Sequence, residues 1–173
     1  MMIEGGAVVD YSTKFTIFTD GSALNNKTEA PAGMAVYIPL FKKLFSKSMI
    51  ATNNQAELEA IRYALWWFKS NGEHIHTPDR VVYLFTDSEY SINSISGKWK
   101  KLTSNLAKIS VIRQLIEDIK TSLNVEVRFI HVKAHTRKKD FISLNNDIVD
   151  QEARKKAMEQ KASMSGEVEE VKD

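Results

Sequence analysis

The sequence has 173 residues, a length that suits one domain with short tails rather than several domains. Hydrophobic residues make up 43% of it and charged residues 27%, which excludes an intrinsically disordered chain, and a net charge of +2 is too small to indicate a partner. The absence of cysteine excludes disulfides and thiolate metal sites, and no apolar stretch approaches the roughly 18 residues of a membrane span. The first residues also lack the basic start and apolar core of a secretory signal, so we expect an intracellular protein that does not enter a membrane.

The ends of the chain differ in character from its middle. From Ser165 on, the residues are mostly acidic and show no apolar periodicity. We expect residues 1–12 and 162–173 to be disordered tails. The predicted domain therefore spans residues 13–161.

Three β-prone stretches open this domain. Residues 15–19 alternate aromatic or aliphatic side chains with threonine, residues 32–40 are β-prone, and residues 42–50 alternate charged and apolar side chains. Only a short turn near residues 39–41 separates the last two stretches. The three are therefore predicted to form an antiparallel meander.

Helices and two further strands follow. A helix capped by Asn53 or Asn54 is expected to end at Gly72, and the nearly continuous apolar run at residues 80–85 is typical of a strand buried on both faces. The remaining predicted elements are helices at 88–95 and 106–123, a strand at 125–132, and a helix from Asn145 or Asn146 to about Gln160. This order predicts an α/β protein with a mixed five-stranded sheet, three antiparallel strands and then two parallel ones, flanked by helices and joined by right-handed crossovers.

Four acidic residues stand at informative places in this pattern. Asp20 ends the run FTIFTD and Asp87 ends VVYLFTD, so each is expected at the end of a strand. Glu57 lies in the first helix and Asp150 in the last. Ligands of α/β sheets bind beyond the carboxyl ends of the strands, and carboxylates gathered there need a divalent cation such as Mg²⁺ or Mn²⁺ to neutralise them. Pairs of such ions promote displacement at phosphorus.

Five short motifs, in order along the chain, carry a resemblance to one enzyme family. They are TDGS (19–22), TNNQAELEA (52–60), TDSEY (86–90), HVKAHT (131–136) and NNDIVDQEA (145–153). Together they resemble a type 1 ribonuclease H, over residues 13–160. The resemblance implies the ribonuclease H-like fold and an endoribonuclease that hydrolyses the RNA strand of RNA–DNA hybrids. It also implies two Mg²⁺ ions, which Mn²⁺ can replace, and products with 5′-phosphate and 3′-hydroxyl ends.

The resemblance assigns roles to residues of these motifs. Asp20, Glu57, Asp87 and Asp150 match the catalytic, metal-binding carboxylates, and His135 matches a catalytic loop histidine that assists proton transfer or product release. Contacts to the hybrid are implied for Gly21, Ser22, Asn26, Thr52, Asn53, Asn54, Ser88, Glu89, Trp99, Lys100 and Lys101. Among these, Thr52 would hold a DNA phosphate, and the two asparagines of the TNN motif would reach minor-groove acceptors that every base offers.

Some positions leave alternatives open. Asn25 rather than Asn26 could supply the loop contact, and Asp147 competes with Asp150, which we prefer because the residues after it match the family. Glu89 replaces the glutamine that relatives often carry, and a carboxylate cannot donate a hydrogen bond as an amide does. The basic insertion that many relatives carry after position 99 is shortened here.

Two other functions fit the same fold. One is a DNA nuclease or strand transferase, and the other is a non-catalytic module that binds hybrids. The first class usually carries extra DNA-binding domains, which we do not expect in this chain, and the second has lost one or more of the acids, whereas all four are present. We therefore expect an enzyme that binds RNA–DNA hybrid as a monomer, without an obligate protein partner.

Overall fold

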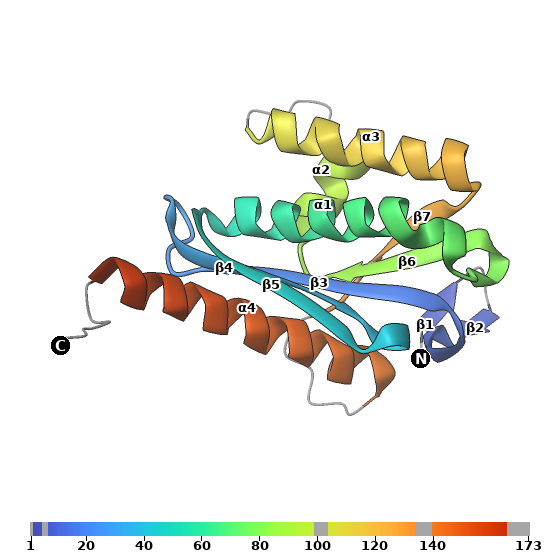
Figure 1. Cartoon of the computed structure of the whole chain (residues 1–173), viewed down its shortest axis with the longest axis horizontal. Helices are drawn as coiled ribbons and strands as arrows, with labels where there is room; N and C mark the ends of the chain where they lie inside the picture. The colour runs from blue at the N-terminus through green and yellow to red at the C-terminus, as the bar shows by residue number, and fades with distance from the viewer. Residues whose placement is uncertain (1, 5–6, 99–103, 134–139, 166–173) are drawn as a thin grey trace.

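The computed structural model describes residues 2–4, 7–98, 104–133 and 140–165 of the chain (Figure 1). Its main sheet consists of β3 (Phe15–Ala23), β4 (Ala30–Ile38), β5 (Lys43–Ala51), β6 (Val81–Thr86) and β7 (Glu126–His131), in the order β5-β4-β3-β6-β7. Strand β4 is antiparallel to both β3 and β5, whereas β6 is parallel to β3 and β7 is parallel to β6. The fold class predicted from the sequence is confirmed.

The α-helices of the described residues cover both faces of this sheet (Figure 1). They are α1 (Asn53–Asn71), α2 (Glu89–Ser96), α3 (Leu106–Leu123) and α4 (Phe141–Ser165). Helix α1 packs on β3 and β4, with α3 against α1, while α4 crosses β3, β4 and β5 on the opposite face. Within the described part of the chain, no helix has the length and apolar character needed to cross a membrane.

Alternation along β3 sends its side chains into two separate cores. Phe15 belongs to the core that contains α1, whereas Phe18 belongs to the core that contains α4. Phe18 and Phe85 are register partners in β3 and β6, and their rings stack with centroids 4.4 Å apart. Because side chains on one face recur every second residue, this pair directs Asp20 and Asp87 toward the same side of the sheet.

The structure differs from the expected disordered tail at residues 1–12. The strands β1 (Met2–Glu4) and β2 (Ala7–Val9) form an antiparallel pair, and a 3-10 turn at Tyr11–Thr13 leads into β3. Tyr11 is 4% exposed, and its ring meets Tyr83 and Phe85 edge-on, with centroids 5.0 and 5.1 Å away. The folded part of the chain therefore begins before residue 13.

The last helix also differs from its predicted limits. It begins at Phe141 rather than near Asn145, because the Asp140 carboxylate accepts a hydrogen bond from the backbone N–H of Ser143 at 2.9 Å and caps the first turn. It continues to Ser165, beyond the expected domain end at residue 161. Residues 166–173, the rest of the expected acidic tail, lie outside the described residues.

Candidate active site

Asp20 lies inside a strand rather than at its end. The predicted end of this strand at Thr19 is wrong, because β3 continues past it as the antiparallel partner of β4. The parallel pairing of β3 with β6, however, stops at Phe18 and Phe85. Asp20 therefore stands just beyond the point where β3 and β6 stop pairing, and Asp87 directly follows β6. Both acids reach the crevice beyond the carboxyl ends of the parallel strands.

Helix α1 brings Glu57 to the same crevice. Its N-cap is Thr52 and not a predicted asparagine: the Thr52 hydroxyl accepts from the Gln55 N–H at 3.1 Å, and the Gln55 side chain accepts from the Thr52 N–H at 2.9 Å. The side-chain oxygen of Asn53 instead accepts from the backbone N–H of Ala23 in β3 at 3.2 Å. These bonds fix the first turn of α1 beside β3 and so orient Glu57.

Gly21 allows α1 to approach β3 closely. Its N–H donates to Glu57 Oε1 at 2.7 Å and lies 2.9 Å from Asp20 Oδ1. A β-carbon at this position would lie 2.3 Å from the backbone nitrogen of Glu57 and 2.4 Å from the carbonyl carbon of Ala56. Glycine is therefore required for the geometry that joins the two acids.

Replacing Gly21 with alanine is expected to destabilise the protein by about 2–3 kcal/mol, because helix backbone rather than a flexible side chain would have to move. The melting temperature, measured by differential scanning calorimetry, should fall by about 4 °C or more. Ser22→Ala is the control at the neighbouring position and should melt near the unsubstituted protein. An unchanged melting temperature for Gly21→Ala would contradict the close approach of α1 and β3.

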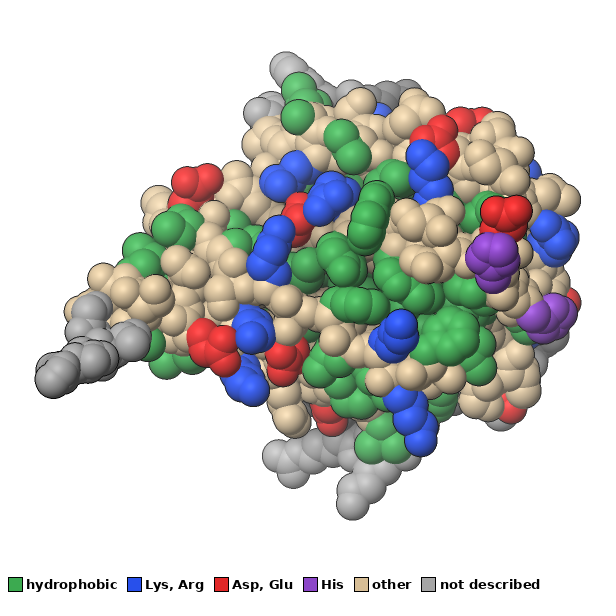
Figure 2. Space-filling view, in the orientation of Figure 1, with side chains coloured by type: hydrophobic (Ala, Val, Ile, Leu, Met, Phe, Trp, Pro, Cys, Tyr) green, Lys and Arg blue, Asp and Glu red, His purple; other side chains and the backbone are tan. Residues whose placement is uncertain are grey.

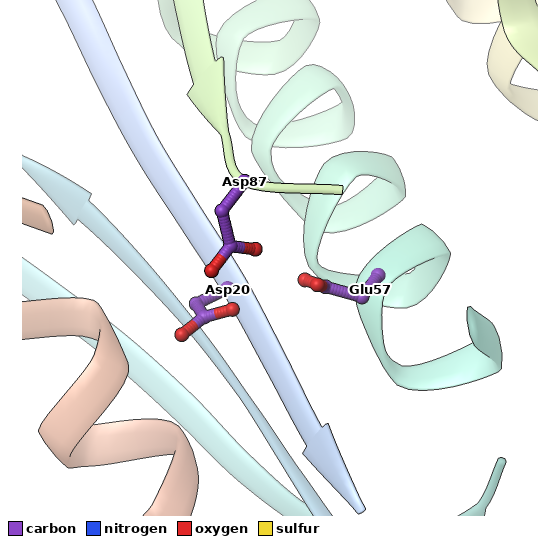
Figure 3. Close-up of side chains that lie close together, drawn as sticks. All are labelled: Asp20, Glu57 and Asp87. Atoms are coloured by element: carbon purple, nitrogen blue, oxygen red, sulfur yellow. The ribbon is translucent and has the colours of Figure 1, made fainter. Parts of the chain in front are cut away.

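Three of the predicted acids converge from separate elements (Figure 3). A carboxylate oxygen from each of Asp20, Glu57 and Asp87 lies within 4.8 Å of those of the other two. Burial raises the pKa of Asp20 well above its ordinary value, and the negative charges of Asp87 and Asp150 raise it further. Burial also raises the pKa of Glu57 well above its ordinary value, and the negative charges of Asp20 and Asp87 add to this effect. Buried carboxylates so close together are costly as free anions. Their oxygen atoms suit a hard divalent cation such as Mg²⁺ or Mn²⁺.

The fourth acid stands beside this group on α4. Asp150 lines the same cavity, and its Oδ1 forms an ion pair with Arg154 Nε, one helical turn on, at 3.3 Å. Asp147, the alternative fourth ligand, is exposed on the same helix. The phase of α4 therefore favours Asp150 as the residue that faces the other acids.

The cavity around these acids has a volume of about 390 Å³. It is lined by Asp20, Gly21, Ser22, Asn53, Asn54, Glu57, Asp87, Ser88, Glu89, Tyr90, Asp150 and Arg154. Sequence reasoning missed two of them, Tyr90 and Arg154. Tyr90 stands in the quoted motif TDSEY, and Arg154 follows Asp150 by one helical turn, so helical phase could have indicated Arg154 once α4 was assigned.

The other predicted contacts lie around this cavity or outside the described residues. Thr52 does not line it but caps α1, and Asn26 is exposed in the loop between β3 and β4. Asn25, the alternative to Asn26, accepts from two backbone N–H groups of that loop, at 2.9 and 3.3 Å. His135, Trp99, Lys100 and Lys101 lie outside the described residues.

Comparison with known proteins identifies relatives of this chain in sequence. The family model described as RNase H matches residues 12–158. The ribonuclease H of Tropheryma whipplei (strain Twist) is 35% identical over 124 residues, which cover 68% of this chain and 71% of that protein. The ribonuclease H of Chlorobium phaeovibrioides is 30% identical over 132 residues, covering 71% of this chain and 84% of that one.

Solved structures show the same fold. LC11-RNase H1, isolated from compost, superposes with a TM-score of 0.61 at 22% identity, covering 84% of this chain and 96% of that one. The structure of LC11-RNase H1 in complex with an RNA/DNA hybrid gives a TM-score of 0.62 at 24% identity, with coverages of 82% and 95%. Together with the family model and the curated relatives, these likenesses lead to one conclusion: this chain belongs to the ribonuclease H family.

Proposed function

We propose that this chain hydrolyses the RNA strand of RNA–DNA hybrids and leaves 5′-phosphate and 3′-hydroxyl ends. The observation that carries the proposal is the convergence of Asp20, Glu57 and Asp87, with Asp150 in the same cavity. Membership of the ribonuclease H family supports it, as does the hybrid bound to LC11-RNase H1, a protein of the same fold.

The donor set fits two Mg²⁺ ions, with Mn²⁺ as a substitute. Asp20, Glu57, Asp87 and Asp150 would hold them, since they offer only hard oxygen ligands. When bound, the ions lower the pKa of the attacking water and stabilise the leaving 3′ oxygen. The protein itself orients the ligands: the Gly21 N–H holds Glu57 in place, and Arg154 holds Asp150.

Other residues of the cavity can distinguish RNA from DNA and bind without sequence preference. At a single nucleotide, only the 2′-hydroxyl group distinguishes RNA from DNA. The cavity where this hydroxyl would lie is lined by Glu57, the backbone of Gly21 and Ser22, and Ser88. Asn53 uses its side-chain oxygen on Ala23, so its amide nitrogen supplies donors for minor-groove acceptors.

Thr52 can combine its structural role with the phosphate contact that the family resemblance implies. Its hydroxyl oxygen accepts from Gln55 as the helix cap, and the hydroxyl hydrogen supplies a donor for a DNA phosphate. The roles of His135, Trp99, Lys100 and Lys101 rest on the resemblance and stay predictions.

The ends of the products test the proposed chemistry. A hybrid labelled separately on its RNA and DNA strands is incubated with Mg²⁺, and the fragments are analysed for terminal phosphate. We expect cut RNA with 5′-phosphate and 3′-hydroxyl ends and an intact DNA strand, because water attacks phosphorus and the 3′ oxygen leaves. Cyclic 2′,3′-phosphate ends would rule the mechanism out, since they require attack by the 2′-hydroxyl.

A further inference from the structure

Strand β5 forms one edge of the main sheet (Figure 1). All nine of its residues pair with β4 on the inner side, from Lys43 opposite Ile38 to Ala51 opposite Ala30, and no strand of the described residues pairs with its outer side. Because the residues of an antiparallel strand direct their N–H and C=O groups to alternate sides, about half of these groups face outward from β5. The outer edge therefore offers a row of hydrogen-bonding groups to a further strand.

The sequence of β5 leaves this edge open to pairing. Edge strands are usually short, or are interrupted by a bulge, a proline or several charged side chains. The pairing of β5 with β4 continues through nine consecutive residues without a bulge, its sequence KLFSKSMIA contains no proline, and its charged residues are Lys43 and Lys47. All of its residues except Ala51 are at least partly exposed. This edge is thus longer than a typical strand of about five or six residues and is accessible along most of its length.

A groove of about 490 Å³ lies along β5 on the side of α1. Its lining includes residues 44–47 of β5 and Arg62 and Tyr63 of α1. On the opposite face of β5, helix α4 is already bound to the strand, because the Ser46 and Ser48 hydroxyls donate hydrogen bonds to α4 at 2.6 and 2.8 Å. The side of the edge that is open to a partner is therefore the side of α1.

Aromatic side chains continue this groove along α1. The ring centroids of Phe45 and Tyr63 lie 5.4 Å apart, and those of Tyr63 and Trp66 lie 5.5 Å apart. Trp66 is 47% exposed, and Leu44 in β5 is 41% exposed. Figure 2 shows apolar side chains gathered over β5 and α1, with Lys and Arg side chains around them. Rings that pack against one another in this way form a rigid apolar surface, which is typical of the core of a protein–protein contact.

The charges beside the groove favour an acidic partner over a second copy of this chain. Because side chains alternate along a strand, Lys43, Phe45 and Lys47 lie on the same face of β5, the face toward α1. Lys47 and Arg62 share the Glu59 carboxylate, at 3.1 and 2.7 Å, so positive charge exceeds negative charge on this face. Two copies joined edge to edge would bring these cations together, whereas acidic side chains on a partner strand neutralise them.

We propose that β5 binds an extended segment of another protein, which adds a sixth strand to the five-stranded sheet. On the face toward α1, the segment places an acidic side chain opposite Lys43, an apolar one opposite Phe45 and an acidic one opposite Lys47. It therefore carries the pattern acidic-x-apolar-x-acidic. Neither β4 nor β5 lines the acid cavity, so this docking surface goes beyond the proposed function and lets a partner hold the chain without covering the acids.

A synthetic peptide with this pattern tests the proposal without nucleic acid. The probe is Thr-Glu-Thr-Phe-Thr-Glu-Thr, which reads the same in both directions and so fits parallel or antiparallel pairing. Its binding is followed by NMR, and the outward-facing amides of β5 should exchange with solvent about tenfold more slowly in the complex. Failure of the peptide to bind, or binding that leaves the β5 amides unchanged, would overturn the proposal.

Two methylated probes separate strand pairing from simple contact between side chains. One carries N-methyl groups on the backbone of its glutamates and phenylalanine, and the other carries them on its inner threonines. Successive residues of a strand point their N–H groups to opposite edges, so one probe should bind like the parent peptide and the other should bind about tenfold or more weakly. Equal affinities for the two methylated probes would show that no strand is added.

A reversal of charge tests the predicted pattern. Lys43→Glu should weaken binding of the parent peptide about tenfold, and a peptide with lysine in place of glutamate should prefer this variant to the unsubstituted protein. Lys120→Glu, an exposed substitution at the far end of α3, is the matched control and should not change either affinity. If the protein instead forms a dimer that protects the β5 amides, a second copy occupies the edge and the proposal is wrong. Hybrid cleavage in Mg²⁺ with saturating peptide should be unchanged and is measured separately, so it reports on the proposed function alone.

Discussion

Asp20→Asn is expected to lower the turnover of hybrid by about 10³-fold or more. The substitution removes an anionic ligand from the centre of the acid group, and a loss of about 4 kcal/mol of transition-state stabilisation corresponds to that factor. Asp87→Asn should act in the same way, because its carboxylate belongs to the same group. Hybrid binding in Ca²⁺ should persist in both variants, so single-turnover rates and binding are measured side by side.

Asp147→Asn is the matched control for this prediction. It removes the same charge from α4, but Asp147 is exposed whereas Asp150 lines the cavity. Its rate should stay near that of the unsubstituted protein. Turnover by Asp20→Asn at the unsubstituted rate would show that the acid group is not the catalytic centre.

Glu57→Gln is expected to stabilise the protein in the absence of divalent metal. The pKa of Glu57 is raised in the folded state, first by burial and then by Asp20 and Asp87. At a pH below the ordinary pKa of a glutamate, Glu57 is protonated in both the folded and the unfolded state, so its ionisation does not lower the free energy of unfolding. As the pH rises toward the folded pKa, the unfolded state releases its proton first, so the free energy of unfolding falls. A neutral glutamine avoids this loss, and a gain of about 1 kcal/mol would raise the melting temperature by about 2–4 °C.

The difference in melting temperature between Glu57→Gln and the unsubstituted protein, both in chelator, should therefore grow from acidic to neutral pH. With Mg²⁺ in excess the order should reverse, because the ion stabilises the protein that binds it more tightly. A variant that melts lower than the unsubstituted protein in chelator at neutral pH would contradict the raised pKa of Glu57.

The sequence predicted the fold because its apolar runs are long and end at distinctive residues. The run before Asp87 and the motif that contains Glu57 placed a buried strand and a helix correctly. The sequence could not show how far β3 extends past Asp20, since that depends on pairing with β4. Nor could it show that Tyr11 is buried, because its aromatic partners Tyr83 and Phe85 meet it only in the folded chain.

Side-chain partners in the site were equally hard to predict. The asparagines of the TNN motif are good helix caps in isolation. Thr52 is the N-cap instead, because Thr52 and Gln55 form both hydrogen bonds of a capping box. Asn53 is then free to bind β3. Arg154 went unnoticed because an arginine in a charged helix looks like an ordinary solvated residue until Asp150 is placed beside it.

Cleavage of a panel of labelled substrates tests the central claim most directly. RNA–DNA hybrid, double-stranded RNA, single-stranded RNA and duplex DNA are each incubated with the protein, once with Mg²⁺ and once with chelator. We predict that the RNA strand of the hybrid is cut fastest, that duplex DNA stays intact, and that cleavage stops in chelator. Cutting of the DNA duplex, or hybrid cleavage that continues undiminished in chelator, would contradict the account.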